Sequence, residues 1–211
     1  MLITKIGKSR KGRNGYAVYI DEALSFHASE AMLTKFGLRR GVQLDQETVE
    51  EIASASSMEE ARSVAVNLIS YRPRSSKELS DKLKQKGFSA EIACDVIRHL
   101  QDVNLVNDLE FARMLVRDKL RGKPMGRAMV RRKLLEKGIG FQIVERVLKE
   151  YISEDDEREA ATRLAAKKLK LSRSRFADLD TSRRRKRMMD YLVGRGFSAE
   201  VALKTVRTVF P

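Results

Sequence analysis

The chain has 211 residues, of which 42% are hydrophobic, 43 are Lys or Arg and 29 are Asp or Glu, so the formal net charge is +14. This composition excludes an intrinsically disordered chain, and the charge predicts attraction to a polyanion, most commonly nucleic acid. No apolar run reaches the roughly 18 residues of a membrane span, no secretory leader is expected, and the single cysteine fits a reducing compartment. We therefore expect a cytoplasmic protein that does not enter a membrane.

The first 56 residues predict a small α+β module. Short β-branched or aromatic runs favour strands over residues 2–7, 16–20 and 24–27. The polar loop from Lys8 to Arg13 precedes Asn14-Gly15, a pair typical of a hairpin turn. Ser29 and Asp45 are placed to cap short helices, the second running to about Ala53.

From Ser57 onward, helix starts replace strand signals. Capping boxes, in which an N-cap acceptor is followed by an acid three residues later, occur at Ser57-x-x-Glu60, Ser75-x-x-Glu78 and Asn107-x-x-Glu110. Apolar stripes with helical spacing follow each of them. The sequence thus predicts a new helix at each of these three starts.

One short pattern occurs three times in this helical part. A leucine stands four residues before a glycine, and an apolar residue follows that glycine. The leucines are Leu83, Leu134 and Leu192, the glycines Gly87, Gly138 and Gly196, and the apolar residues Phe88, Ile139 and Phe197. Glycine at a helix end favours a left-handed backbone, so each copy predicts a turn between two helices.

These signals predict a mainly α protein. Its tandem three-helix, helix-turn-helix-like repeats would form an elongated, curved array after the α+β module. The predicted limits are residues 1–56 for the module and residues 57–106, 107–152 and 153–211 for the repeats. The second glycine spacing is longer than the first, which predicts a mobile loop inserted between Leu171 and Thr181.

Residues suited to catalysis or metal binding are scarce. The only histidines are His27 and His99, and Cys94 and His99 are too poorly spaced to share one helical face. We expect Cys94 to be a small core or boundary residue and His99 a helix-surface residue. The acidic run at residues 154–159 is typical of a helix start. No enzyme activity, metal or cofactor is predicted.

Basic residues are the candidate binding residues. In each predicted repeat they gather at the turn before the second helix and along that helix. Exposed like charges repel, so folding alone gives no reason to gather them, and stacked repeats would join them into one basic stripe. The candidates are Arg72, Arg74, Lys77, Arg121, Lys123, Arg127, Arg131, Arg132, Arg183, Arg184 and Arg187.

The predicted third helices do not favour reading of base sequence. They carry Glu91, Asp95, Glu145 and Glu200 beside apolar residues, whereas base edges are usually read by Arg, Asn or Gln. We expect contacts with single- and double-stranded DNA to fall on phosphates, with little sequence preference. The alternative function is a helix-turn-helix DNA-binding transcription regulator that uses one repeat.

Four ordered motifs between about Ala61 and Phe210 resemble the RecX family of bacterial RecA regulators. They are Arg74-Ser75-x-x-Glu78-Leu79-x-x-Lys82-Leu83-x-x-Lys86-Gly87-Phe88, Leu105-x-Asn107-Asp108-x-x-Phe111-Ala112, Gly126 leading to Leu134-x-x-Lys137-Gly138-Ile139, and Arg195-Gly196-Phe197-Ser198. The resemblance implies a non-enzymatic modulator, expected to inhibit. Such a protein would lie in the groove of a RecA filament on DNA and affect ATPase, strand exchange and filament lifetime. We expect it to be a monomer.

Overall fold

The structure is a computed structural model that describes residues 1–9, 15–122, 124–172 and 179–210. The predicted Asn14 turn, Lys123 and the middle of the predicted 171–181 loop lie outside these residues. The chain forms two compact units, the first made of Met1–Arg72 with Leu79–Leu105 and the second of Pro73–Glu78 with Val106–Pro211.

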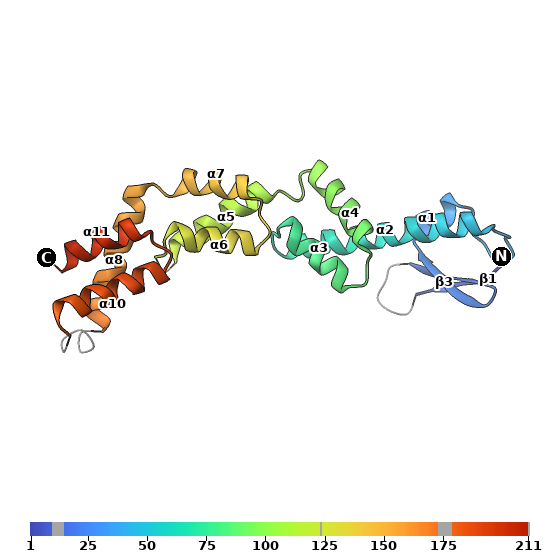
Figure 1. The fold of residues 1–211 in the computed structure, drawn as a ribbon. Coiled ribbons are helices and arrows are strands. Elements are labelled where there is room, and N and C mark those ends of the chain that lie inside the picture. The colour runs from blue at the N-terminus through green and yellow to red at the C-terminus, as the bar shows by residue number, and fades with distance from the viewer. Residues whose placement is uncertain (10–14, 123, 173–178, 211) are drawn as a thin grey trace. The chain divides into compact units, whose positions relative to one another are not determined.

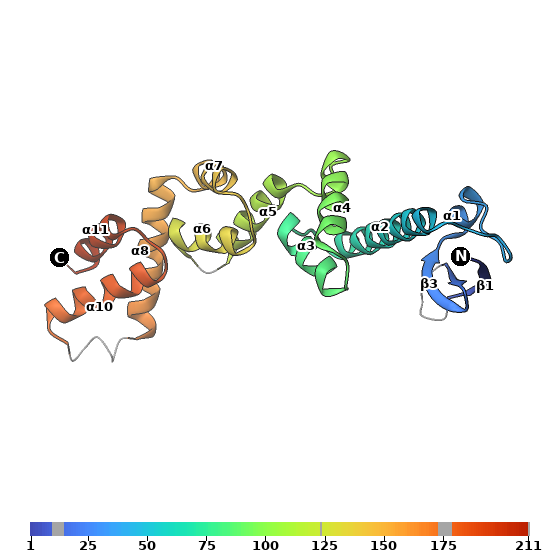
Figure 2. The ribbon, with the colours of Figure 1, turned by 45° about the vertical axis from the view of Figure 1, so that its right-hand side comes forward.

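The first unit begins with a three-stranded antiparallel sheet. Its strands are β1 (Ile3–Lys8), β2 (Tyr16–Ile20) and β3 (Ala23–Ala28), in the order β1-β2-β3. The pairing of β1 with β2 confirms the predicted hairpin. Helix α1 (Glu30–Lys35) follows, and Ser29 caps it as predicted. The sheet packs against α2 through β3 (Figure 2).

Helix α2 (Gln46–Tyr71) shows that the predicted helix start at Ser57 is wrong. Asp45 caps α2 as predicted, but the helix continues for 26 residues without a break. No Gly or Pro interrupts residues 46–71, and the Ser56 hydroxyl donates to the carbonyl of His27 on β3. The predicted boundary between residues 56 and 57 therefore falls inside one helix, and the other domain limits stay predictions.

Within the described residues, three groups of helices confirm the mainly α fold with tandem repeats (Figure 1). The end of α2 joins α3 (Ser76–Gln85) and α4 (Ala90–Asp102) in the first group. The second contains α5 (Asp108–Arg121), α6 (Arg127–Glu136) and α7 (Phe141–Tyr151), and the third α8 (Glu154–Leu171), α10 (Thr181–Gly194) and α11 (Ala199–Val209). We refer to these groups as repeats 1, 2 and 3.

The repeated glycine pattern has the predicted structural role. Gly87, Gly138 and Gly196 adopt φ values of +94°, +77° and +87°, in the left-handed region that favours glycine. The leucines four residues earlier are fully buried in all three repeats. The sequence therefore identified both the turns and the buried leucines that precede them.

Cys94 differs from its prediction, because it is exposed. The buried face of α4 is formed by Ala93, Val96, Ile97 and Leu100, and residue 94 points away from that stripe. The Arg98 guanidinium lies 3.8 Å from its sulfur. His99 is exposed, as predicted.

Candidate binding surface

The predicted basic residues differ in how strongly the fold already uses them. Arg121 and Arg187 are exposed on the second unit, whereas Arg74, Arg127 and Arg184 are half-buried there. Arg72 is exposed but belongs to the first unit. The candidates therefore include both surface charges and side chains that are partly enclosed by the fold.

Arg131 is engaged in an ion pair inside repeat 2. Its Nε and Nη2 atoms donate to the two carboxylate oxygens of Glu145 on α7, at 2.6 and 2.9 Å. The hydrogen bond from Arg131 lowers the pKa of Glu145 below its usual value, and the same bond raises the pKa of Arg131. The statement that folding gives no reason to gather these charges is therefore wrong for Arg131.

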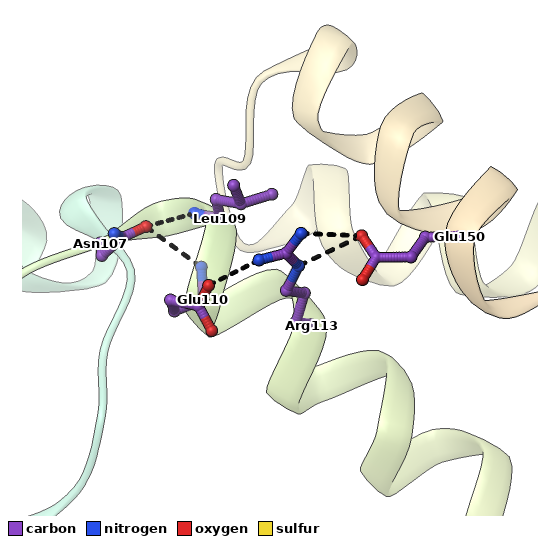
Figure 3. Close-up of polar contacts among 5 residues, drawn as sticks. All are labelled: Asn107, Leu109, Glu110, Arg113 and Glu150. Atoms are coloured by element: carbon purple, nitrogen blue, oxygen red, sulfur yellow. Dashed lines mark hydrogen bonds and ion pairs between the residues drawn. The ribbon is translucent and has the colours of Figure 1, made fainter.

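Arg113 shows the same use of a cation by the fold (Figure 3). Its guanidinium bridges Glu110 on its own helix, at 2.7 Å, and Glu150 on α7, at 2.9 Å. Asn107 caps the same end of α5 by accepting from the backbone N–H groups of Leu109 and Glu110. Arg113 thus ties the first helix of repeat 2 to the third.

Arg132 and Arg183 make weaker local pairs. Arg132 lies 3.6 Å from Glu136, one turn along α6, and Arg183 lies 3.3 Å from Asp180, the cap of α10. All four side chains are more than half exposed. Exposed pairs of this kind contribute about 0–1 kcal/mol, so a polyanion can compete for these arginines.

The sequence did not reveal how repeats 2 and 3 join. The start of α6 lies on the turn between α10 and α11, where Gly126 N–H donates to the Arg195 carbonyl at 3.0 Å and Ala128 N–H to the Gly196 carbonyl at 3.1 Å. The Arg127 N–H donates to the buried carboxylate of Glu157 on α8, at 2.8 Å. A carboxylate from one repeat thus caps a helix of the preceding one.

The start of α3, which belongs to the second unit, makes an equivalent junction with repeat 2. The Ser75 hydroxyl donates to the Lys137 carbonyl at 2.6 Å, and Ser76 N–H donates to Asp108 on α5 at 2.8 Å. The Lys137 ammonium also lies 2.6 Å from the Glu78 carboxylate. The carbonyl before the turn glycine accepts a hydrogen bond in both junctions.

The acids of these junctions stand at equivalent positions in repeats 2 and 3. Asp108 and Glu157 each stand four residues before a fully buried alanine, Ala112 and Ala161 respectively. The candidate Lys77 belongs to the junction between α3 and repeat 2, because its side-chain stem lies against Gly138. The structure therefore assigns Lys77 and the backbone of Arg127 to contacts between helical elements.

Within the ranges that the structure describes, every helix is too short or too polar to traverse a lipid bilayer. Among those same residues, no three His, Cys, Asp or Glu side chains gather in a way that could hold a metal ion.

Comparison with known proteins gives consistent matches along the chain. The family models of the RecX first, second and third three-helix domains match residues 61–100, 107–148 and 154–206. Regulatory protein RecX of Listeria monocytogenes serotype 4a (strain HCC23) is 30% identical over 208 residues, which span 99% of this chain and 75% of that protein. Regulatory protein RecX of Clostridium perfringens (strain 13 / Type A) is 28% identical over 97% of this chain and 94% of its own length.

Solved structures agree with these matches. A crystal structure of regulatory protein RecX superimposes with a TM-score of 0.73 at 26% identity, over 96% of this chain and 98% of that one. The crystal structure of RecX from Lactobacillus salivarius shares the fold, with a TM-score of 0.66 at 24% identity. Three domain matches in order, with relatives that align over nearly the whole sequence, show that the chain belongs to the RecX family of regulatory proteins.

Proposed function

We propose that the chain is a non-enzymatic regulator of RecA that binds RecA filaments on DNA through its exposed arginines. The observation that carries this proposal is the match to all three RecX domains in their family order. Binding in the filament groove, inhibition of ATPase and strand exchange, and action as a cytoplasmic monomer are parts of the proposal.

Charge supports the same reading. The net charge of +14 favours association with a filament that contains DNA, since a polyanion attracts a basic ligand over distances of about a Debye length. Arg121, Arg183 and Arg187 are exposed on the second unit. Arg183 can reach a phosphate at the cost of its exposed contact with Asp180.

The central experiment measures RecA ATPase on single-stranded DNA with increasing amounts of the protein. We expect the rate to fall as the filament becomes saturated. An unchanged rate, together with no binding of the protein to assembled filaments, would refute the proposal. Strong preference for one duplex sequence in the absence of RecA would instead favour the helix-turn-helix transcription regulator.

A charge-reversed variant tests the assigned surface. Replacing Arg121, Arg183 and Arg187 with Glu should leave the melting temperature within a few degrees but weaken filament binding at least tenfold, because attraction becomes repulsion. Arg127 and Arg131 are left unchanged, since the junction and the Glu145 pair involve them.

The matched control replaces three exposed arginines of the first unit, Arg39, Arg40 and Arg62, with Glu. The control changes the net charge by the same amount. Equal losses of binding by the two variants would show that overall charge, rather than the assigned surface, governs the interaction.

A further inference from the structure

Three turns in this chain have the same backbone, and two of them are occupied by a helix start. In each turn the N–H after the glycine donates to the carbonyl of the buried leucine, at 3.2 Å for Phe88, 3.1 Å for Ile139 and 3.2 Å for Phe197. The Gly138 turn (residues 137–140) receives the start of α3, and the Gly196 turn (residues 195–198) receives the start of α6.

The Gly87 turn (residues 86–89) differs from the other two in its surroundings. A Cβ added to Gly138 or Gly196 would collide with Lys77 or Met129, whereas one added to Gly87 meets no described atom within 4 Å. Lys86 and Gly87 are both exposed. The first unit therefore presents an open copy of a surface whose other two copies hold a helix start.

The Gly87 turn also keeps the cation that pairs with the incoming helix in the Gly138 turn. Lys86 stands where Lys137 and Arg195 stand, directly before the glycine, so a cation is present at this position in each repeat. In the Gly138 turn this cation pairs with Glu78, and its carbonyl accepts from Ser75. In repeat 1 the position equivalent to Asp108 and Glu157, four residues before buried Ala61, is occupied by Ser57. Its hydroxyl oxygen can accept a hydrogen bond, as the carboxylates do.

A second copy of this chain does not supply a suitable helix start. The starts of α3 and α6 are engaged in the junctions described above, and at the start of α8 the Asp156 carboxylate accepts from its own cap residue, Ser153. In repeat 3 the residue equivalent to Arg127 is Arg185, but α10 begins four residues earlier at Thr181. The N–H of Arg185 is directed to a carbonyl of its own helix, since the fifth helical residue bonds the first.

We propose that the Gly87 turn is a docking site for the start of a helix in a protein partner. The partner helix has Ser or Gly at its N-cap and Asp or Glu three residues later, as in Ser75-x-x-Glu78. Lys86 pairs with that acid, and the Lys86 carbonyl accepts from the N-cap residue. Identification of the partner as RecA rests on the proposed function. The chemistry assigned to the site rests only on the contacts seen in the two occupied turns.

The direct test uses a helix-stabilised synthetic peptide with the sequence of residues 73–85, titrated into the isotope-labelled full chain. We expect NMR shift changes at residues 86–89 and at Ser57, and at least tenfold weaker binding of the same peptide with Glu78→Gln. Equal binding of both peptides, changes confined to other surfaces, or no changes would overturn the proposal.

Variants of the full chain connect this site to the proposed function. Lys86→Glu should weaken both peptide and RecA-filament binding about tenfold, while Lys84→Glu, an exposed control with the same charge change, should alter either by no more than about twofold. Equal effects of the two variants on peptide binding would overturn the site. If the parent protein failed to bind filaments, the proposed function would fall, while the peptide titration would still decide the site.

Discussion

At the residue scale, Gly126 and the turn glycines are required for different physical reasons. Gly138 and Gly196 need a left-handed backbone, whereas Gly126 has an ordinary φ of −78°. A Cβ at Gly126 would instead fall on the Gly196 carbonyl. Close approach of two backbones, rather than local conformation, selects glycine here.

We predict that Gly126→Ala destabilises the second unit by about 1–3 kcal/mol, because the added methyl group forces the junction apart. Chemical unfolding followed by circular dichroism measures this loss. The control is Gly194→Ala, since an added Cβ at this helical position has no described atom within 4 Å. That change should be neutral or stabilise by up to ~1 kcal/mol. Similar losses in both variants would contradict the close-approach argument.

The Arg131–Glu145 pair makes a second residue-scale prediction. The pKa of Glu145 is lowered from 4.5, first by its hydrogen bond from Arg131. A lowered carboxyl pKa contributes stability that is present above the unfolded pKa and is lost as pH falls through the folded pKa. Glu145→Gln should therefore cost up to ~1 kcal/mol at pH 7, a value limited by solvent screening of this partly exposed pair.

The difference between Glu145→Gln and the parent should shrink as the pH is lowered below about 4.5 and through the folded pKa. Unfolding curves recorded between neutral and acidic pH test the sign. Glu136→Gln, which removes the longer Arg132 pair, is a matched control with a smaller expected loss at pH 7. A constant difference across this range would show that the Glu145 pair does not contribute through its charge.

At the element scale, α2 shows how tertiary contacts decide whether a cap-like sequence starts a new helix or lies inside a longer one. Ser57-x-x-Glu60 has the residue types of a helix start, but the preceding segment also favours helix and buries Ile52 in the core of the first unit. The Ser56 hydroxyl also bonds to β3. The long helix therefore continues through the cap-like sequence.

Met58→Pro distinguishes a continuous helix from one that begins at Ser57. Proline at the first helical position is tolerated, but in a helix interior it costs about 3 kcal/mol or more. We expect Met58→Pro to lower the free energy of unfolding by this larger amount. The reference is Met58→Ala, which removes the same side chain but keeps the backbone N–H. Gln46→Pro, at the true first position of α2, should cost much less in the same unfolding measurement. A tolerated Met58→Pro would indicate separate helices.

At the scale of the whole molecule, the net charge of +14 is only partly available to a partner. Arg113 and Arg131 hold helices of repeat 2 together through carboxylates. Arg121 and Arg187 remain exposed on the same unit. Binding to DNA should therefore follow the exposed arginines of the second unit rather than the total charge.

The affinity for DNA should fall steeply with salt. The expected log-log slope is about −0.9 per phosphate neutralised on duplex DNA and about −0.7 on single strands. Replacing Arg121 with Ala should reduce the magnitude of the slope by about one such unit, while Arg62→Ala, on the first unit, should leave it unchanged. Fluorescence titrations at several salt concentrations measure both values, and a flat slope for the parent would contradict phosphate binding.

Part of this molecule could be predicted because the deciding interactions are local. Ser29, Ser89, Asn107, Ser153 and Ser198 cap the helices that follow them. The leucine before each turn glycine is buried, because helical spacing places it on the apolar face. Which arginines remain available to a partner was only partly predictable, because acids on another helix form ion pairs with some of them.

The sequence by itself determined the three-helix repeats, their glycine turns, the paired strands of the module and the family. Caps, helical periodicity and the left-handed preference of glycine act over a few residues and leave a direct trace in the sequence. Only the tertiary structure decided that α2 is one helix, that Arg131 is paired and that Asp108 and Glu157 cap helices of another repeat. These outcomes depend on which surfaces meet across the fold, because a backbone N–H or an exposed arginine carries no local signal of the carboxylate that reaches it.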